Sequence, residues 1–205
     1  MPAMLAALLP WRSFGRRVLI CILFQLVILA QATEHPSVAA VAEDWRPAAP
    51  PALTLNTLDG RTIGLPDAAQ SVTLVHFFAT WCEPCRGELR QLEVLARRYA
   101  HRPLLILAVD VAEPPVRIRR FFATRPVRFP ILLDADRTTM KAWGVDAFPT
   151  TFVLGRGRCP LWRLAGEHDW LTPESLARLE SALATTEGRA LRTPSRHCPS
   201  SGDPP

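Results

Sequence analysis

Two closely spaced cysteines are the residues of this chain best suited to chemistry. Cys82 and Cys85 are separated by two residues, in the stretch WCEPC at 81–85. Such a pair can bind zinc, exchange disulfides or be structurally inert. A zinc site needs further Cys or His ligands, usually as a second close pair, and the chain has no second pair of this kind. The spacing therefore favours dithiol–disulfide exchange and predicts no metal site.

The position of the pair indicates which cysteine reacts. An apolar run at 72–78 predicts a buried strand, and apolar residues recurring every three or four positions from Cys85 to Tyr99 predict an amphipathic helix. The N–H groups and dipole at a helix N-terminus stabilise a thiolate, so we expect Cys82 to be an exposed nucleophile of lowered pKa. Cys85, one turn further along, is expected to be the shielded, resolving thiol. Pro84 suits a first helical turn, where no amide donor is needed.

Strand-like and helix-like segments alternate around this pair. Residues 53–57 and 61–65 flank the turn signal Leu58-Asp59-Gly60 and predict a β-hairpin. Further strands are predicted at 72–78, 104–109, 131–133, 150–154 and 161–165, and further helices at 116–123, 137–143 and 173–184. The pattern predicts an α/β fold with a mixed sheet flanked by helices on both faces.

The first 32 residues have the pattern of an export signal. Arg12, Arg16 and Arg17 precede an apolar run at 18–30, and Ala30-Gln31-Ala32 is a small-x-small cleavage triplet. The run is shorter than the roughly 20 residues of a membrane-spanning helix, although neighbouring apolar residues could extend it. Residues 1–32 are thus predicted to be a cleaved signal peptide or an uncleaved signal anchor. The rest of the chain is then periplasmic or otherwise extracytoplasmic, either secreted or anchored to the inner membrane.

Export changes the meaning of the bulk composition. The formal net charge is +5, from 24 basic and 19 acidic residues, but residues 1–32 hold three of the arginines and no acid. The remainder carries +2, which argues against a nucleic-acid partner. Removing Cys21 with the signal leaves an even number of cysteines, as an oxidising compartment favours. An apolar content of 48% excludes disorder throughout.

The flanks of the domain are rich in proline. Residues 33–51 are predicted to be a Pro/Ala-rich linker, 52–185 the folded domain and 186–205 a flexible tail. Cys159 follows a predicted hairpin turn and Cys198 lies in the tail. These two cysteines could form a structural disulfide, remain free or pair with other chains.

The residues HFFATWCEPCRGEL at 76–89, with AFPTTF downstream at 147–152, resemble the thioredoxin superfamily. Within it they are most similar to the TlpA/ResA-like (DsbE/CcmG-like) thiol-disulfide oxidoreductases. The resemblance covers about residues 52–184, including the N-terminal β-hairpin and a helix–strand insertion at about 113–133. It implies a thioredoxin-like fold and a redox-active Cys82–Cys85 disulfide with no further cofactor. It also implies a part in c-type cytochrome maturation or copper-site assembly.

The resemblance implies roles for residues outside the cysteine pair. It implies a cis Phe148–Pro149 bond beside the disulfide, which leaves the preceding backbone free to pair with a substrate strand. It also places Glu88 close to the cysteines, where a carboxylate would disfavour the thiolate and could relay protons. The alternative for Glu88 is a solvated side chain paired with Arg86 or Arg90.

Two aromatic residues near the motif have open roles. His76 stands six positions before Cys82, where thioredoxins carry a buried acid and many relatives an asparagine. A neutral imidazole there could accept a proton near Cys85, but a lone histidine in an apolar strand is more often satisfied by a backbone partner. Trp81 is expected to pack over the rim of the active site.

The residues between the cysteines indicate the direction of electron flow. Strong oxidants stabilise their thiolate, often with a positive residue at this point. Glu83-Pro84 is negative instead, which is expected to raise the pKa of Cys82 relative to a His or Lys at this point and favours a protein-disulfide reductase. A reductant in an oxidising compartment needs re-reduction, and the resemblance implies a membrane electron donor of the DsbD/CcdA type. Two alternatives stay open: a Cu(I)-binding, metallochaperone-like module, and a disulfide oxidant or isomerase.

Overall fold

The computed structural model describes residues 41–45, 47, 49–65 and 70–190, all within the compact unit Val38–Pro205. The predicted signal segment, most of the predicted linker and the chain beyond 190 lie outside the described residues. The strands are β1 (Val41–Asp44), β2 (Thr54–Asn56), β3 (Thr62–Gly64), β4 (Val72–Phe78), β5 (Leu104–Val111), β6 (Ile131–Asp134), β7 (Thr150–Gly155) and β8 (Cys159–Ala165). The helices are α2 (Glu83–Arg98), α3 (Pro115–Ala123), α4 (Thr138–Ala142) and α5 (Pro173–Ala190), with a 3-10 turn η2 (Arg156–Arg158). Among these helices none is long and apolar enough to cross a membrane.

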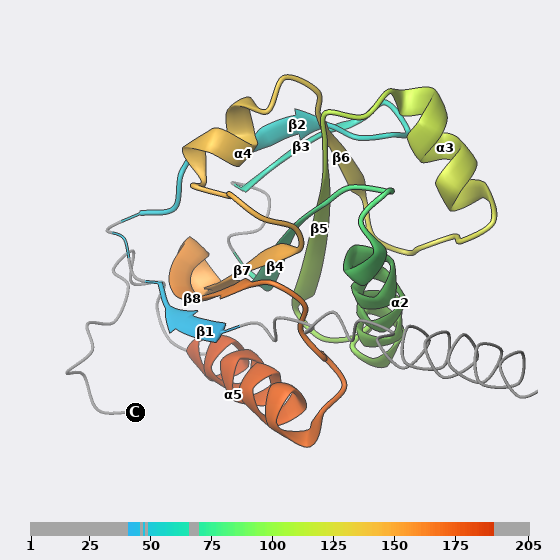
Figure 1. Cartoon of the computed structure of the whole chain (residues 1–205). Coiled ribbons are helices and arrows are strands. Elements are labelled where there is room, and N and C mark those ends of the chain that lie inside the picture. The colour runs from blue at the N-terminus through green and yellow to red at the C-terminus, as the bar shows by residue number, and fades with distance from the viewer. Residues whose placement is uncertain (1–40, 46, 48, 66–69, 191–205) are drawn as a thin grey trace, which may run out of the picture. The chain divides into compact units, whose positions relative to one another are not determined.

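A six-stranded mixed sheet forms the centre of the fold, in the order β1-β8-β7-β4-β5-β6 (Figure 1). Strands β4, β5 and β6 run parallel to one another, whereas β7, β8 and β1 pair antiparallel. The second sheet is the β2–β3 hairpin, which meets β6 through a bridge between Thr57 and Leu132. The predicted mixed α/β architecture, with its N-terminal hairpin and helix–strand insertion, is confirmed.

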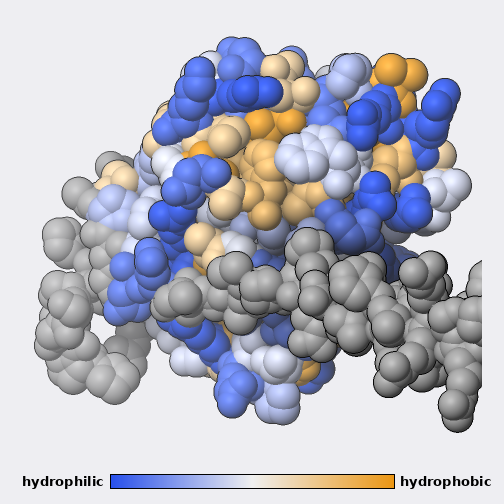
Figure 2. Space-filling view, in the orientation of Figure 1, coloured by the Kyte–Doolittle hydropathy of each residue, from blue (hydrophilic) through white to orange (hydrophobic). Residues whose placement is uncertain are grey.

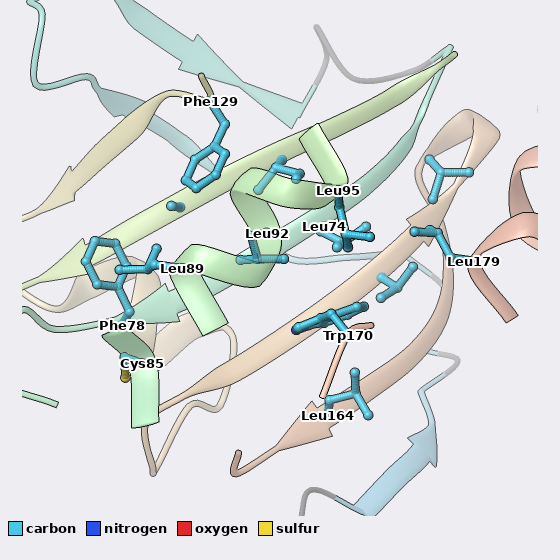
Figure 3. Packing of buried hydrophobic residues seen from close by; sticks show 14 of the residues in the cluster. Leu74, Phe78, Cys85, Leu89, Leu92, Leu95, Phe129, Leu164, Trp170 and Leu179 are labelled. Carbon is cyan, nitrogen blue, oxygen red and sulfur yellow. The ribbon is translucent and has the colours of Figure 1, made fainter. Parts of the chain in front are cut away.

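Helices cover both faces of this sheet because its central strands are apolar on both sides. One cluster of buried residues joins α2, α3 and α5 to the sheet, and Figure 3 shows Leu89, Leu92 and Leu179 of this layer packed with Leu74 and Phe78. The other face is covered by the segments around the hairpin and α4, whose Leu53, Leu65 and Trp143 pack on Phe77 and Phe152.

Strand β4 lies in the middle of the sheet, and all seven of its residues are buried. Side chains alternate between the two faces of a strand, so His76 and Phe78 lie on the α2 face while Val75 and Phe77 lie on the other. The chain leaves β4 at Phe78 and enters α2 at Glu83. The sheet thereby fixes where helix α2 begins.

The predicted linker and tail boundaries are wrong. Residues 41–44, assigned to the linker, form β1, which pairs antiparallel with β8. Sheet edges pair through the backbone, so a short segment can add a strand without any hydrophobic period in its sequence. Trp45 follows β1 and stacks on Trp143 with ring centroids 5.6 Å apart. At the other end α5 continues to Ala190, beyond the predicted boundary at 185.

Replacing Trp45 tests whether β1 belongs to the folded domain. We expect Trp45→Ala to lower the free energy of unfolding by about 2 kcal/mol, since the ring packs on both Trp143 and Phe152. The matched control is Trp81→Ala, which removes an exposed ring and should cost less than about 1 kcal/mol. Equal, small losses in urea denaturation of both variants would show that Trp45 is not part of the core.

Candidate active site

The two cysteines of the motif form a disulfide at the start of α2. Cys82 is the N-cap residue of the helix, and its sulfur accepts a hydrogen bond from the Cys85 N–H at 3.3 Å. Pro84 lies in the first turn, as expected. This placement directs the helix dipole and an N–H donor at the Cys82 sulfur, both of which favour a thiolate once the disulfide is reduced.

The expectation that Cys82 is freely exposed is wrong. Its residue surface is only 6% exposed, against 0% for Cys85. The order of exposure still makes Cys82 the accessible sulfur of the pair. Cys82 is nearly buried because the disulfide ties its sulfur to the fully buried Cys85.

A groove lies beside Cys82. Residues 81–84 line one side, and Met140 with residues 146–148 lines the other. The Phe148–Pro149 peptide bond is cis. The Pro149 carbonyl accepts from the Gly166 N–H at 2.9 Å, whereas the backbone groups of Phe148 have no hydrogen-bond partner among the described residues. The groove therefore offers free backbone groups next to the disulfide, as β-strand recognition of a peptide requires.

Trp81 and Glu83 stand at the entrance of this groove. The Trp81 ring is 58% exposed and makes an edge contact with Phe148, at 6.1 Å between centroids. Figure 2 shows apolar side chains gathered on this side of the molecule, between α3 and α4, with hydrophilic ones around them. Glu83 is exposed and forms an ion pair with Arg86 at 2.8 Å. Arg86 thus offsets the Glu83 charge, which weakens the expected influence of Glu83 on the pKa of Cys82.

Glu88 lies on the buried face of α2, one turn after Cys85. Its side chain is 2% exposed, so the alternative of a solvated ion pair with Arg86 or Arg90 is wrong. The carboxylate accepts hydrogen bonds from the backbone N–H of His168 at 2.7 Å and from the Trp170 Nε1–H at 3.0 Å. Burial raises the pKa of Glu88 to about 7, although these two hydrogen bonds oppose the shift. Glu88 can therefore gain or lose a proton near neutral pH.

His76 is completely buried beside Glu88. Its Nδ1 lies 2.9 Å from Thr151 Oγ1 and 3.7 Å from Glu88 Oε2, and its Nε2 has no hydrogen-bond partner in the described part of the chain. The expected backbone partner is therefore wrong, because the β4–β7 pairing brings the Thr151 hydroxyl opposite His76 instead. Burial lowers the pKa of His76 to about 3, so the imidazole is neutral at working pH.

A second group of buried carboxyls lies on the other side of the loop that carries Cys82. Asp110, near the end of β5, is 1% exposed, and Glu113 follows three residues later. Glu113 accepts hydrogen bonds from both the backbone N–H and the hydroxyl of Thr80. Arg117 contacts the same carboxylate at 2.8 Å. Only Trp81 separates Thr80 from Cys82 in the sequence, so this group adjoins the redox site.

The structure describes only one of the two cysteines of the predicted Cys159–Cys198 disulfide. Cys159 is the first residue of β8; it is buried and disulfide-bonded. Cys198 lies outside the described residues, so the predicted Cys159–Cys198 pairing stays a prediction. Within the described ranges, no cluster of three or more His, Cys, Asp or Glu side chains could hold a metal ion.

Several site residues were missed by sequence reasoning. The partners of Glu88, His168 and Trp170, lie some eighty residues away in the chain and carry no local signal. Asp110 did have one, because a lone acid inside the apolar run LLILAVDV is as unusual as His76 inside VTLVHFF.

The fold and the cysteine pair define the class of protein. A six-stranded mixed sheet with a Cys-x-x-Cys disulfide at the start of α2, opposite a cis-proline, is a thioredoxin-like fold. The sequence profile of the AhpC/TSA family matches residues 48–158. The chain belongs to this family.

Individual relatives agree with this assignment. The chain is 32% identical over 104 residues to the thiol-disulfide oxidoreductase ResA of Bacillus subtilis, an alignment covering 51% of this chain and 58% of ResA. It is 29% identical to the sporulation thiol-disulfide oxidoreductase A of the same organism, covering 57% of this chain and 72% of that protein. The match to the first of these relatives thus spans less than two thirds of its length.

Solved structures show the same fold. The crystal structure of StoA from Bacillus subtilis superposes with a TM-score of 0.55 at 25% identity, covering 65% of this chain and 99% of StoA. A thiol:disulfide interchange protein of the thioredoxin family from Chlorobium tepidum gives 0.59 at 23% identity, covering 69% and 99%.

The raised pKa of Glu88 predicts a pH-dependent stability. A carboxyl whose pKa rises on folding destabilises the protein as pH increases from its unfolded value, about 4.5, to about 7. Relative to the wild type, Glu88→Gln should therefore gain stability across this window, by an amount on the order of 3 kcal/mol. The measurement is urea denaturation at several pH values. His76 contributes equally to the pH dependence of stability in both proteins, so its contribution cancels when the two unfolding free energies are subtracted.

Trp170→Phe is the matched variant, and it should change the pH dependence of stability in the opposite direction. It keeps Glu88 but removes the Nε1–H donor that favours the ionised carboxylate. Its loss of stability between these pH values should be steeper than that of the wild type. A pH-independent difference for Glu88→Gln would contradict a raised pKa at this position.

Proposed function

We propose that the chain is an exported thiol-disulfide oxidoreductase that reduces disulfides in partner proteins. The observation that carries this proposal is the Cys82–Cys85 disulfide at the N-terminus of α2, beside a groove with free Phe148 backbone groups. The names of the relatives, thiol-disulfide oxidoreductases, support it. The disulfide itself is the only redox group that this activity needs.

The reaction consists of two thiol–disulfide exchanges. In the reduced protein, the Cys82 thiolate attacks one sulfur of the partner disulfide, and the other partner sulfur leaves as a thiolate and takes up a proton. Cys85, deprotonated in turn, then attacks the Cys82 sulfur and releases the second partner thiol. Two electrons pass to the partner, and the chain is left with the Cys82–Cys85 disulfide.

Cys85 is fully buried and must lose its proton for the second exchange. Glu88 lies one turn further on the same buried face of α2 and titrates near neutral pH. We assign Glu88 the role of accepting the Cys85 proton, in line with general base catalysis by a carboxylate of raised pKa. His76 is neutral, and its Nδ1 lies 3.7 Å from the Glu88 carboxylate.

The buried carboxyls also bear on the direction of electron flow. A negative environment raises the pKa of thiols, destabilises the dithiolate form and makes the couple more reducing. Glu83 contributes little because Arg86 pairs with it. Glu88, by contrast, is shielded from water and close in the helix to Cys85. This supports a reductant over an oxidant or isomerase.

The remaining parts of the proposal concern partners and location. The substrates are disulfide-containing proteins, with c-type cytochrome apoproteins or copper-site proteins as the class implied by the TlpA/ResA-like resemblance. The protein works outside the cytoplasm, held at the membrane or released according to the fate of residues 1–32. A membrane electron donor of the DsbD/CcdA type returns Cys82 and Cys85 to the reduced state.

Replacing the resolving cysteine tests the exchange directly. In Cys85→Ser the mixed disulfide at Cys82 cannot be resolved, so the variant should accumulate a covalent complex with a protein disulfide such as that of insulin. Non-reducing electrophoresis and mass spectrometry would detect the complex and show that reducing agent dissolves it. In cells, the trapped protein identifies the substrate.

The control is Cys82→Ser, which should trap nothing and reduce insulin no faster than the chemical reductant alone. If Cys85→Ser forms no complex with insulin or with any cellular protein, the proposed exchange is wrong. Stoichiometric Cu(I) in the reduced wild type, without insulin reduction, would point to the metallochaperone-like alternative instead.

A further inference from the structure

Thr80, two residues before Cys82, is held by charged side chains from three parts of the fold. Glu113 accepts from its backbone N–H and its hydroxyl, the latter at 2.7 Å. Arg86 of α2 donates to the Thr80 carbonyl at 2.8 Å. Arg117 of α3 lies 3.2 Å from the Thr80 hydroxyl. Every polar group of this one residue is thus bound to a charged partner.

The backbone around Glu113 is shaped for this contact. The preceding residue, Ala112, has a φ of 59°, a left-handed conformation that non-glycine residues adopt at a cost. Its N–H donates to the Asp134 carbonyl at 3.0 Å, which fixes the turn against β6. The turn directs the Glu113 carboxylate back toward the end of β4. This strained turn allows Glu113 to accept both hydrogen bonds of Thr80. We call this pair of hydrogen bonds the hold on Thr80.

Asp110 lies at the base of the same turn without a hydrogen-bond partner for either carboxyl oxygen among the described residues. An ionised carboxylate in such a place would be very unfavourable. Burial, reinforced by the nearby Glu113 carboxylate, raises the pKa of Asp110 to about 8, and Arg117 opposes the shift. Asp110 is therefore neutral at pH 7.

The charged and titratable groups around Asp110 come from each neighbouring element. Glu113 and Arg117 belong to the turn and to α3, and Arg86 of α2 reaches the cluster through Thr80. On β4, His76 lies on the same face as Asp110 but is neutral. On β6, the Asp134 carboxylate is bound to the first turn of α4 by the backbone N–H groups of Thr139 and Met140. Within the described part of the chain, Glu113 is the only negatively charged neighbour of Asp110 that also binds the loop.

We propose that Glu113 is a positioning residue for protein substrates: through Thr80 it fixes the loop that presents Trp81 and Cys82 to the groove. Trp81 meets Phe148 across the groove, so the hold on Thr80 sets the spacing between Cys82 and the backbone that receives a substrate strand. A protein disulfide depends on this spacing, whereas a small disulfide needs only the Cys82 sulfur. Ionisation of Asp110 puts a second negative charge beside Glu113 and loosens the hold.

This inference rests on the proposed function for its substrate and is tested by comparing two disulfides. Glu113→Gln should raise the KM for insulin about tenfold, because the amide cannot accept both hydrogen bonds of Thr80. The reaction of the reduced variant with a small aromatic disulfide, 5,5′-dithiobis(2-nitrobenzoic acid), should stay within about twofold of wild type. An unchanged KM in the folded full chain would overturn the proposal.

Glu93→Gln is the matched control. Glu93 is another buried glutamate, on α2, whose carboxylate also holds a loop, by accepting the Arg128 N–H at 2.7 Å. It lies more than two turns beyond Cys85, so its replacement should alter neither reaction. An equal rise in KM for Glu93→Gln would mean that the effect of Glu113→Gln reflects general loosening of the fold, which would also overturn the proposal.

Asp110→Asn tests the part played by the neutral carboxyl. The KM of the wild type for insulin should rise severalfold between pH 7 and 9 as Asp110 ionises, and this rise should be absent in Asp110→Asn. The same rise in both proteins would contradict a role for Asp110.

Two further measurements apply if Glu113→Gln does not fold or if the wild type does not reduce insulin. Should Glu113→Gln not fold, Thr80→Val removes one of the two hydrogen bonds at constant shape and should raise the KM about threefold. Should the wild type not reduce insulin, the proposed function fails, but hydrogen exchange still tests the hold. The Thr80 amide should then exchange faster in Glu113→Gln and not in Glu93→Gln, and equal exchange rates would overturn the hold itself.

Discussion

The Cys85 N–H donates to the Cys82 sulfur, so the N-terminus of helix α2 is capped by the sulfur atom that reacts. This contact depends on a four-residue connection between β4, buried on both faces at the centre of the sheet, and the first turn of the helix. The helix is held in turn by its apolar face, which packs on β4 and α5 (Figure 3). The rest of the fold serves to keep this helix N-terminus opposite the cis-proline segment at 146–149.

Three buried carboxyls lie near that start, and Glu88, the one on α2 itself, acts against the helix dipole when it is ionised. The dipole and the N–H donor favour a Cys82 thiolate. Glu88 lies beneath the pair on one side, while Asp110 and Glu113 lie beside the preceding loop. The first two have raised pKa values because they are shielded from water, so each is a place where a proton can be held near neutral pH. The site thus combines a thiolate-stabilising backbone with an acidic surrounding, which suits a reductant that must give up its electrons readily.

Local sequence signals are sufficient to predict features that depend on a single helix or strand. The strand at 72–78 has the predicted limits because its residues are apolar except for Thr73 and His76, and α2 starts at the motif because cysteine and proline suit its first turn. Contacts between distant segments were not predictable. β1 was assigned to a linker because edge pairing uses the backbone, and the partners of Glu88 and Thr80 come from the distant segments 168–170 and 113–117. His76 and Asp110 stand out in the sequence as titratable residues inside apolar strand segments, and the sequence does not say what they contact.

The reduction potential of the Cys82–Cys85 couple tests the central claim most directly. It is measured by equilibrating the full chain with dithiothreitol or glutathione buffers and following the fraction of disulfide. An acidic, water-shielded surrounding predicts a reducing couple, with a potential below about −250 mV. A potential near that of a strong oxidant, about −120 mV, would contradict the account of a disulfide reductase.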